Sequence, residues 1–140
     1  MSTKDTYNNV LEKAANLEVA TETVSGHVPN VRTVNYVYFP NESANTIYFI
    51  TSKDANKVKE ITANNQVSFT TSPSEAGTVR VTGATATDAN DKKDEIFTEM
   101  TKRYSDFQMD DQKARDGMQA YGLTFTEAEV IGADGGKVEF

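Results

Sequence analysis

The chain has 140 residues, and its 14 lysines and arginines against 21 aspartates and glutamates give a net charge of −7, which argues against nucleic acid or an anionic membrane as the main partner. The absence of cysteine excludes disulfides and thiol catalysis, and a single histidine, His27, cannot form a multi-histidine metal site within one chain. No apolar run has membrane-spanning length and no signal-peptide core is present, so we expect one cytoplasmic domain over residues 1–140 without a metal.

The N-terminal part is predicted to be a short amphipathic helix followed by a β-hairpin. Residues 5–15 repeat apolar side chains at helical spacing, and residues 17–24 and 31–39 have the composition of strands. The turn between these strands is marked by Ser25-Gly26-His27. His27 is expected to be a solvated turn residue rather than a catalytic base, because no partner for it is visible in the sequence.

The predicted strand over residues 31–39 carries two polar side chains, Arg32 and Asn35, on opposite faces of an otherwise apolar pattern. Such groups need hydrogen-bond partners if they are buried. Either face is therefore a candidate wall of a ligand cleft. The alternative is an arginine at a strand end that reaches solvent.

The most informative stretch, residues 46–71, is predicted to be a buried strand, a polar turn, a short helix and a second strand over residues 66–71. Ser52 or Asp54 is the expected cap of the helix, since either side chain can accept a backbone N–H bond. The helix should pack one apolar face and show three charged side chains to water: Lys57, Lys59 and Glu60.

The turn in this stretch has the chemistry of an anion site. A helix N-terminus carries unpaired N–H groups and about half a positive charge, which suits a phosphate. Thr51 and Ser52 add hydroxyl groups, and Lys53 and Lys57 add cations on the same side. The alternative is an ordinary capped surface helix, which is common in mixed folds.

The second half of the chain contains one long strand over residues 78–87, in which the apolar alternation changes phase at Gly83 and so predicts a β-bulge. A helix over residues 88–104, opened by Asp88 or Asn90, and a short helix before Gly117 are expected next. A last long strand over residues 123–131 and a turn into residues 138–140 complete the pattern. Antiparallel strands joined by hairpins, with few helices between them, favour a mainly β protein built as a small barrel with flanking helices.

The order of these elements and several local patterns resemble the pyridoxamine 5′-phosphate oxidase-like family of flavin-binding split barrels, particularly its short, general-stress-protein-like members. The resemblance covers residues 17–131. It rests on Pro-Asn-Val-Arg-Thr-Val-Asn (29–35), Ile-Tyr-Phe-Ile-Thr-Ser-Lys-Asp-Ala-Asn-Lys-Val (47–58), Asn-Asn-Gln-Val-Ser-Phe (64–69) and Val-Arg-Val-Thr-Gly (79–83).

The resemblance implies a split β-barrel of antiparallel strands that binds flavin mononucleotide (FMN). It places the phosphate against Lys57, Arg32 and the turn at Thr51 and Ser52, and the flavin ring along two backbone segments, residues 32–35 and 50–51. The implied cofactor-binding residues are Arg32, Thr33, Val34, Asn35, Ile50, Thr51, Ser52, Lys53, Asn56 and Lys57.

Two departures from the family pattern affect these expectations. Ala55 and Asn56 stand where the family often has serine and arginine before the lysine, so phosphate binding is expected to be weakened or redistributed. The sequence also ends at Phe140 without the arginine-bearing tail of true pyridoxamine phosphate oxidases, so we do not expect vitamin B6 synthesis.

The leading hypothesis is therefore an FMN-binding oxidoreductase that acts on a small-molecule substrate. A non-catalytic flavin, haem or deazaflavin-binding protein related to stress is the alternative, and a barrel that has lost its ligand and serves in assembly is a third. The family places its flavin between two protomers, and four aromatic side chains favour the same homodimer if the core does not use them: Tyr36, Tyr38, Tyr104 and Phe107.

Overall fold

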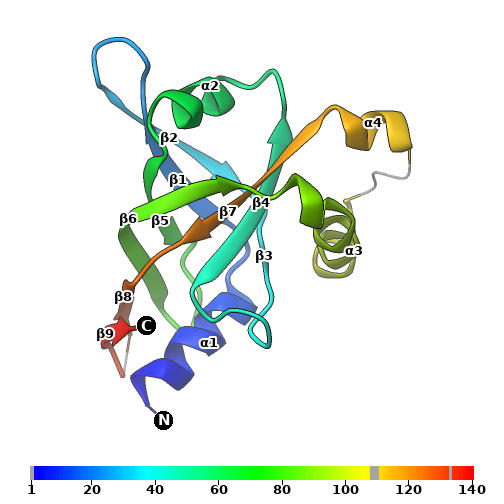
Figure 1. Ribbon diagram of the computed structural model, residues 1–140. Coiled ribbons are helices and arrows are strands. Elements are labelled where there is room, and N and C mark those ends of the chain that lie inside the picture. The colour runs from blue at the N-terminus through cyan, green and yellow to red at the C-terminus, as the bar shows by residue number, and fades with distance from the viewer. Residues whose placement is uncertain (1, 108–110, 133) are drawn as a thin grey trace.

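The computed structural model describes residues 2–107, 111–132 and 134–140, and its antiparallel sheet curls into a barrel that does not close (Figure 1). The strands are β1 (Leu17–Glu22), β2 (Pro29–Val34), β3 (Val37–Tyr38), β4 (Thr46–Ser52), β5 (Gln66–Thr71), β6 (Thr78–Asp88), β7 (Met118–Thr124), β8 (Glu127–Ile131) and β9 (Gly136–Glu139). The helices are α1 (Thr3–Lys13), α2 (Asn56–Ala63), the 3₁₀ turn η1 (Asn90–Lys92), α3 (Lys93–Arg103) and α4 (Gln112–Asp116). The predicted class, a mainly β split barrel with flanking helices, is confirmed. In the part of the chain given by these ranges, no helix is long and apolar enough to cross a bilayer.

Neighbouring strands follow the order β2-β1-β5-β6-β7-β4-β3, and all of the pairs are antiparallel. β6 joins the two halves of the sheet: one edge pairs with β5, and the other pairs first with β8 and then with β7. β2 and β3 lie at opposite ends of this order, although only residues 35 and 36 separate them in the chain. This short connection brings the two ends of the sheet back together.

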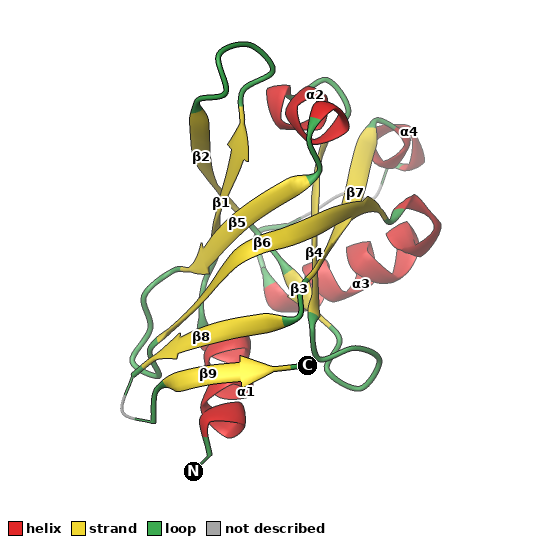
Figure 2. Cartoon of the chain, turned by 60° about the vertical axis from the view of Figure 1, so that its left-hand side comes forward, coloured by secondary structure: helices red, strands yellow, loops and turns green. Residues whose placement is uncertain are grey.

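Two helices lie at opposite ends of the sheet, α1 at one end and α2 at the other (Figures 1 and 2). α1 begins with a capping box, in which Ser2 and Asp5 each bond the other's backbone N–H. Its apolar face is buried in the main core through Tyr7, Val10 and Leu11, as the periodicity predicted. The α1 end of the barrel is therefore filled mainly by apolar side chains.

A second, smaller core lies under α3. Ile96 and Met100 of this helix pack with Val37 of β3 and Ala120 of β7. Arg103, the last residue of α3, donates hydrogen bonds to two carbonyl groups at the C-terminal end of α1. These contacts fasten α3 to both β3 and α1.

The β-bulge predicted at Gly83 is confirmed. Val67 and Phe69 of β5 are two residues apart, whereas their partners on β6, Ala84 and Val81, are three residues apart. β6 therefore contains one extra residue, and Gly83 adopts a φ of +81° at that point. The extra residue allows both Val81 and Ala84 to face the core, where they are buried.

The single strand predicted over residues 31–39 is wrong, because the chain leaves the sheet at Asn35 and Tyr36 and forms β2 and β3 instead. The backbone N–H of Tyr36 donates to the Tyr104 hydroxyl at 3.1 Å. The Tyr36 hydroxyl in turn donates to the Leu11 carbonyl at 2.6 Å. At this position, hydrogen bonds to α1 and to the C-terminal end of α3 thus take the place of pairing with another strand.

The strand predicted over residues 123–131 is also wrong, since β7 already begins at Met118 and a separate strand, β8, follows Phe125 and Thr126. The Phe125 N–H donates to the Asn45 carbonyl, and the Thr126 carbonyl accepts from Phe140. The chain therefore changes strand partners at Phe125 and Thr126 instead of continuing as one strand.

The remaining predicted helices and the terminal hairpin agree with the structure except at their boundaries. The helix expected over residues 88–104 begins as η1, where Asp88 accepts a bond from the Asn90 N–H at 2.8 Å, and continues as α3. The short helix before Gly117 is α4, and the final strand pairs with β8.

We predict that Gly83→Ala lowers the free energy of unfolding by about 1–2 kcal/mol, because a Cβ disfavours a positive φ. No atom lies within 4 Å of the added Cβ, so crowding would not contribute. Gly117→Ala is the matched control, since Gly117 has a φ of −81° and its added Cβ would come no closer than 3.5 Å to other atoms. Urea unfolding of the two variants measures the difference, and equal stabilities would contradict a conformational requirement at Gly83.

Candidate cofactor site

The site predicted from the sequence lies at the α2 end of the barrel, where two strand edges are open. β2 pairs with β1 along one edge, and β4 pairs with β7 along one edge. The other edge of β4 is covered by β3 at Ile47 and Tyr48. In the described ranges, no strand pairs with the second edge of β2 or with residues 49–52 on the second edge of β4. Backbone groups on such edges can hydrogen-bond a ligand.

The turn before α2 differs from the prediction at its cap. Ala55 occupies the N-cap position and makes no side-chain capping bond. The Ser52 hydroxyl accepts from the Asp54 N–H at 3.3 Å, so neither predicted capping residue bonds the first turn of the helix. Lys53 is anchored through its backbone N–H, which donates to the Gly117 carbonyl at 3.0 Å. Among the described residues, therefore, no side chain accepts a hydrogen bond from the N–H groups of the first turn of α2.

A buried polar network lies beneath α2. The terminal nitrogens of Arg32 donate to the Thr21 hydroxyl at 2.7 Å, the Val19 carbonyl at 3.3 Å and the Glu60 carboxylate at 3.0 Å. Glu60 also accepts from the Thr21 hydroxyl and, at 3.3–3.4 Å, from the Asn30 amide. These contacts satisfy the expectation that a buried Arg32 needs partners.

Glu60 itself contradicts the prediction that it faces water, because its side chain is only 7% exposed. The hydrogen bond from Thr21 is the main cause that lowers the pKa of this carboxyl group, and Asn30 and Arg32 lower it further, while burial acts in the opposite direction. Glu60 is therefore a buried carboxylate held in its ionised form by surrounding donors.

Lys57 lies beside this network and contacts β4. Its ammonium group donates to the buried Thr51 hydroxyl at 2.8 Å. Burial lowers the pKa of Lys57, and the nearby positive charge of Arg32 lowers it further, whereas Glu60 partly opposes both effects. In the described part of the chain, no acidic side chain forms an ion pair with Lys57.

The structure therefore brings together Arg32, Thr51 and Lys57 from three different elements. The other residues implied by the resemblance are distributed around them. Three are exposed on the turn and the start of α2, Ser52, Lys53 and Asn56. Val34 is buried in the main core, Ile50 packs on the second core under α3, and Thr33 is exposed.

Asn35 lies apart from Lys57, in the connection between β2 and β3. Its side-chain oxygen accepts from Asn16 at 2.6 Å. Both asparagines line an open cavity of about 530 Å³, whose wall also includes Arg103, Tyr104 and other residues of the segment after α3. Asn35 therefore belongs to the wall of this cavity and hydrogen-bonds Asn16 there.

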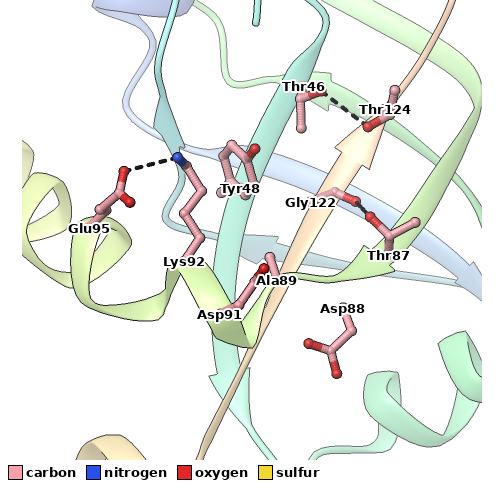
Figure 3. Close-up of a pocket in the computed structure, with 10 residues that line it drawn as sticks. All are labelled: Thr46, Tyr48, Thr87, Asp88, Ala89, Asp91, Lys92, Glu95, Gly122 and Thr124. Carbon is pink, nitrogen blue, oxygen red and sulfur yellow. Dashed lines mark hydrogen bonds and ion pairs between the residues drawn. The ribbon is translucent and has the colours of Figure 1, made fainter. Parts of the chain in front are cut away.

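Another cavity, of about 370 Å³, lies between β4, β7 and the start of α3 (Figure 3). One side is lined by threonine hydroxyls and the other by acidic groups and Lys92. Lys92 pairs with Glu42 at 2.8 Å and with Glu95 at 2.9 Å, and it lies over the rings of Phe39 and Tyr48. Because Lys92, the one lysine among the described residues that line it, is already paired with two carboxylates, this cavity is poorly suited to a phosphate.

Sequence reasoning missed three members of the polar network, Thr21, Asn30 and Glu60. The alternation of β1 offered a clue for Thr21, since it follows Leu17 and Val19 at the same spacing and all three are buried. Glu60 lies three residues after Lys57, a spacing that places two helical side chains on one face.

His27 is exposed in the β1–β2 turn, as predicted, but it has a partner, because its Nδ1 contacts the Glu22 carboxylate. This turn also has a positive φ of 54° at His27. The pair lies on the hairpin, and among the described residues neither member hydrogen-bonds to Lys57 or Thr51.

Three solved structures illustrate the similarity of the fold. General Stress Protein 26 from Bacillus anthracis superposes with a TM-score of 0.74 at 12% identity, covering 100% of both chains. A FAD-binding protein from Mesorhizobium loti gives 0.66 at 15% identity, covering 91% of this chain and 92% of the other. An F420 reductase gives 0.68 at 15% identity, with 84% and 91% covered. At these identities the superpositions establish the fold alone.

No curated protein matches the sequence closely enough to count as a relative. The family model described as pyridoxamine 5′-phosphate oxidase, in contrast, matches residues 3–132, which is most of the chain. The match includes the strands, the turn and the helix that carry Arg32, Thr51 and Lys57. The chain therefore belongs to the pyridoxamine 5′-phosphate oxidase-like family of split-barrel proteins.

Proposed function

We propose that this protein binds FMN at the α2 end of the barrel and acts as an oxidoreductase on a small molecule. The observation that carries the proposal is the Lys57 ammonium, which contacts the neutral hydroxyl of Thr51 next to the positive charge of Arg32. A cation with no acidic partner among the described residues, beside two open strand edges, is suited to an anionic ligand that also needs backbone hydrogen bonds.

The residues at this end fit the two parts of FMN. Lys57, the Thr51 and Ser52 hydroxyls and the uncapped first turn of α2 would hold the phosphate. The backbone of residues 32–35 and 50–51 would hold the flavin ring, and N–H groups there would stabilise negative charge on it. The bound flavin supplies the hydride or electron transfer, while the chain binds and orients it.

A deazaflavin is the second candidate ligand, because one structurally similar protein is an F420 reductase. Titration of the protein with FMN, FAD and F420, followed by absorption and fluorescence, compares these ligands directly. Reduction of the bound flavin by a nicotinamide donor, and reoxidation by a candidate substrate, then separates an enzyme from a binding protein. A protein that binds none of the three would contradict the proposal.

We predict that Lys57→Ala weakens FMN binding roughly 10- to 150-fold, since a charge-assisted hydrogen bond is worth about 1.5–3 kcal/mol. Riboflavin has the same ring without the phosphate, so its affinity should change little. Fluorescence quenching titrations with both flavins measure the two dissociation constants.

Lys59→Ala is the matched control, because Lys59 is exposed on the same helix, whereas the hydrogen bond to Thr51 comes from Lys57. It should leave the affinity for both flavins nearly unchanged. Equal losses of FMN and riboflavin binding in Lys57→Ala would instead assign Lys57 to the fold or to the ring.

The homodimer expected from the resemblance is part of this proposal, but the candidate interface residues differ from those that the sequence indicated. Tyr36 and Tyr38 are buried within the chain's own core, so they are not available for an interface. Three other apolar side chains are 56–65% exposed and are available for an interface: Val24 and Val28 in the turn between β1 and β2, and Val31 in β2.

We predict a species of about twice 15.4 kDa in light scattering at micromolar concentration. Val28→Glu should shift this species toward the monomer, because a carboxylate would replace an exposed apolar side chain at the interface. A monomeric wild-type protein would contradict the homodimer without bearing on flavin binding to one chain.

A further inference from the structure

Of the cations at the α2 end, Lys53 and Lys59 are exposed, whereas Arg32 and Lys57 hydrogen-bond the strands, and the environments of these two differ. Both terminal nitrogens of Arg32 are engaged within the barrel wall, by Thr21, by the Val19 carbonyl and by Glu60. Its side chain is 20% exposed. The guanidinium therefore already has an anionic partner before any ligand arrives.

The Glu60 carboxylate is fixed in place from several directions. Its contacts are all with donors: the Thr21 hydroxyl, the Asn30 amide and the Arg32 guanidinium. The donors come from β1 and β2, while Glu60 belongs to α2. A buried carboxylate with this set of partners is held rigidly and stays charged.

The charge at this end follows from these contacts. Among the three charged side chains that hydrogen-bond the strands here, Arg32 and Lys57 contribute two positive charges and Glu60 contributes one negative charge, so their formal charges sum to +1. A phosphate monoester carries about −1.5 to −2 charges at neutral pH. The positive charge of these three side chains together is therefore smaller than the negative charge of a phosphate monoester.

We infer that Glu60 is a specificity-determining residue, which neutralises Arg32 so that Lys57 is the main side-chain ligand of a bound phosphoryl group. Glu60 thereby limits the affinity of this end of the barrel for a phosphate. This inference rests on the proposed function only in taking a phosphoryl group as the ligand at this end of the barrel.

Glu60→Gln tests the inference, because it removes the negative charge and keeps the size of the side chain. Inorganic phosphate is the probe, and its affinity is obtained from the rise in melting temperature with phosphate against chloride at equal ionic strength. The variant should bind phosphate on the order of threefold to tenfold more tightly than the wild type. The same titration with FMN and riboflavin should show a gain for FMN alone.

Two further variants make the result specific. Glu75→Gln removes the same charge from an exposed loop at the far end of β5 and should give no gain. The double variant Arg32→Gln with Glu60→Gln should lose the gain of Glu60→Gln, because it takes away the freed guanidinium. The double variant also removes both members of the buried pair, so it provides a measurement if Glu60→Gln alone does not fold.

The inference is overturned if Glu60→Gln binds phosphate no more tightly than the wild type, or if Glu75→Gln gains as much. It is also overturned if the double variant loses as much phosphate affinity as Lys57→Ala, since Arg32 would then hold the phosphate itself. A phosphate gain in Glu60→Gln without flavin binding by the wild type would support the inference and contradict the FMN proposal.

Discussion

The buried ion pair between Arg32 and Glu60 is the contact on which the α2 end of the barrel depends. Taking a guanidinium and a carboxylate out of water costs several kcal/mol per ion, and their attraction repays this only when further hydrogen bonds are made. Thr21 and Asn30 provide those bonds. Because Glu60 belongs to α2 and its partners belong to β1 and β2, the same network docks the helix on the strands. The position of Lys57 next to Thr51 follows from that docking.

The two ends of the barrel are stabilised by different physical means, and this difference explains where a ligand site can form. At the α1 end, Tyr7 and Leu11 are fully buried in the apolar core, so little polar chemistry is left there. At the α2 end, the inward positions of β1 and β2 carry Thr21, Asn30 and Arg32. Polar groups cluster where the sheet is open, and a charged ligand there does not have to displace an apolar core.

Much of the fold was predictable because local patterns and tertiary contacts agree. The strand over residues 66–71 and the bulge at Gly83 follow from alternation alone. The break between β2 and β3 was not predictable, because Val34, Tyr36 and Tyr38 keep the same alternation and all three are buried. Where the strand ends, the Tyr36 N–H donates to the Tyr104 hydroxyl, which is 68 residues away in the sequence. No pattern within the segment itself contains that information.

The sequence singled out the two cations of this polar cluster but not its anion. Lys57 and Arg32 stand out beside apolar strands, whereas Glu60 looks like an ordinary exposed residue of a short charged helix. Its burial depends on Thr21 and Asn30, whose strands are distant in sequence and meet α2 only in the folded chain. The role that we infer for Glu60 is to neutralise Arg32, which leaves Lys57 as the main side-chain ligand of a phosphoryl group. A list of cofactor-binding residues taken from a family pattern counts Arg32 and Lys57 as equivalent, and a buried carboxylate bonded to one of them makes them unequal.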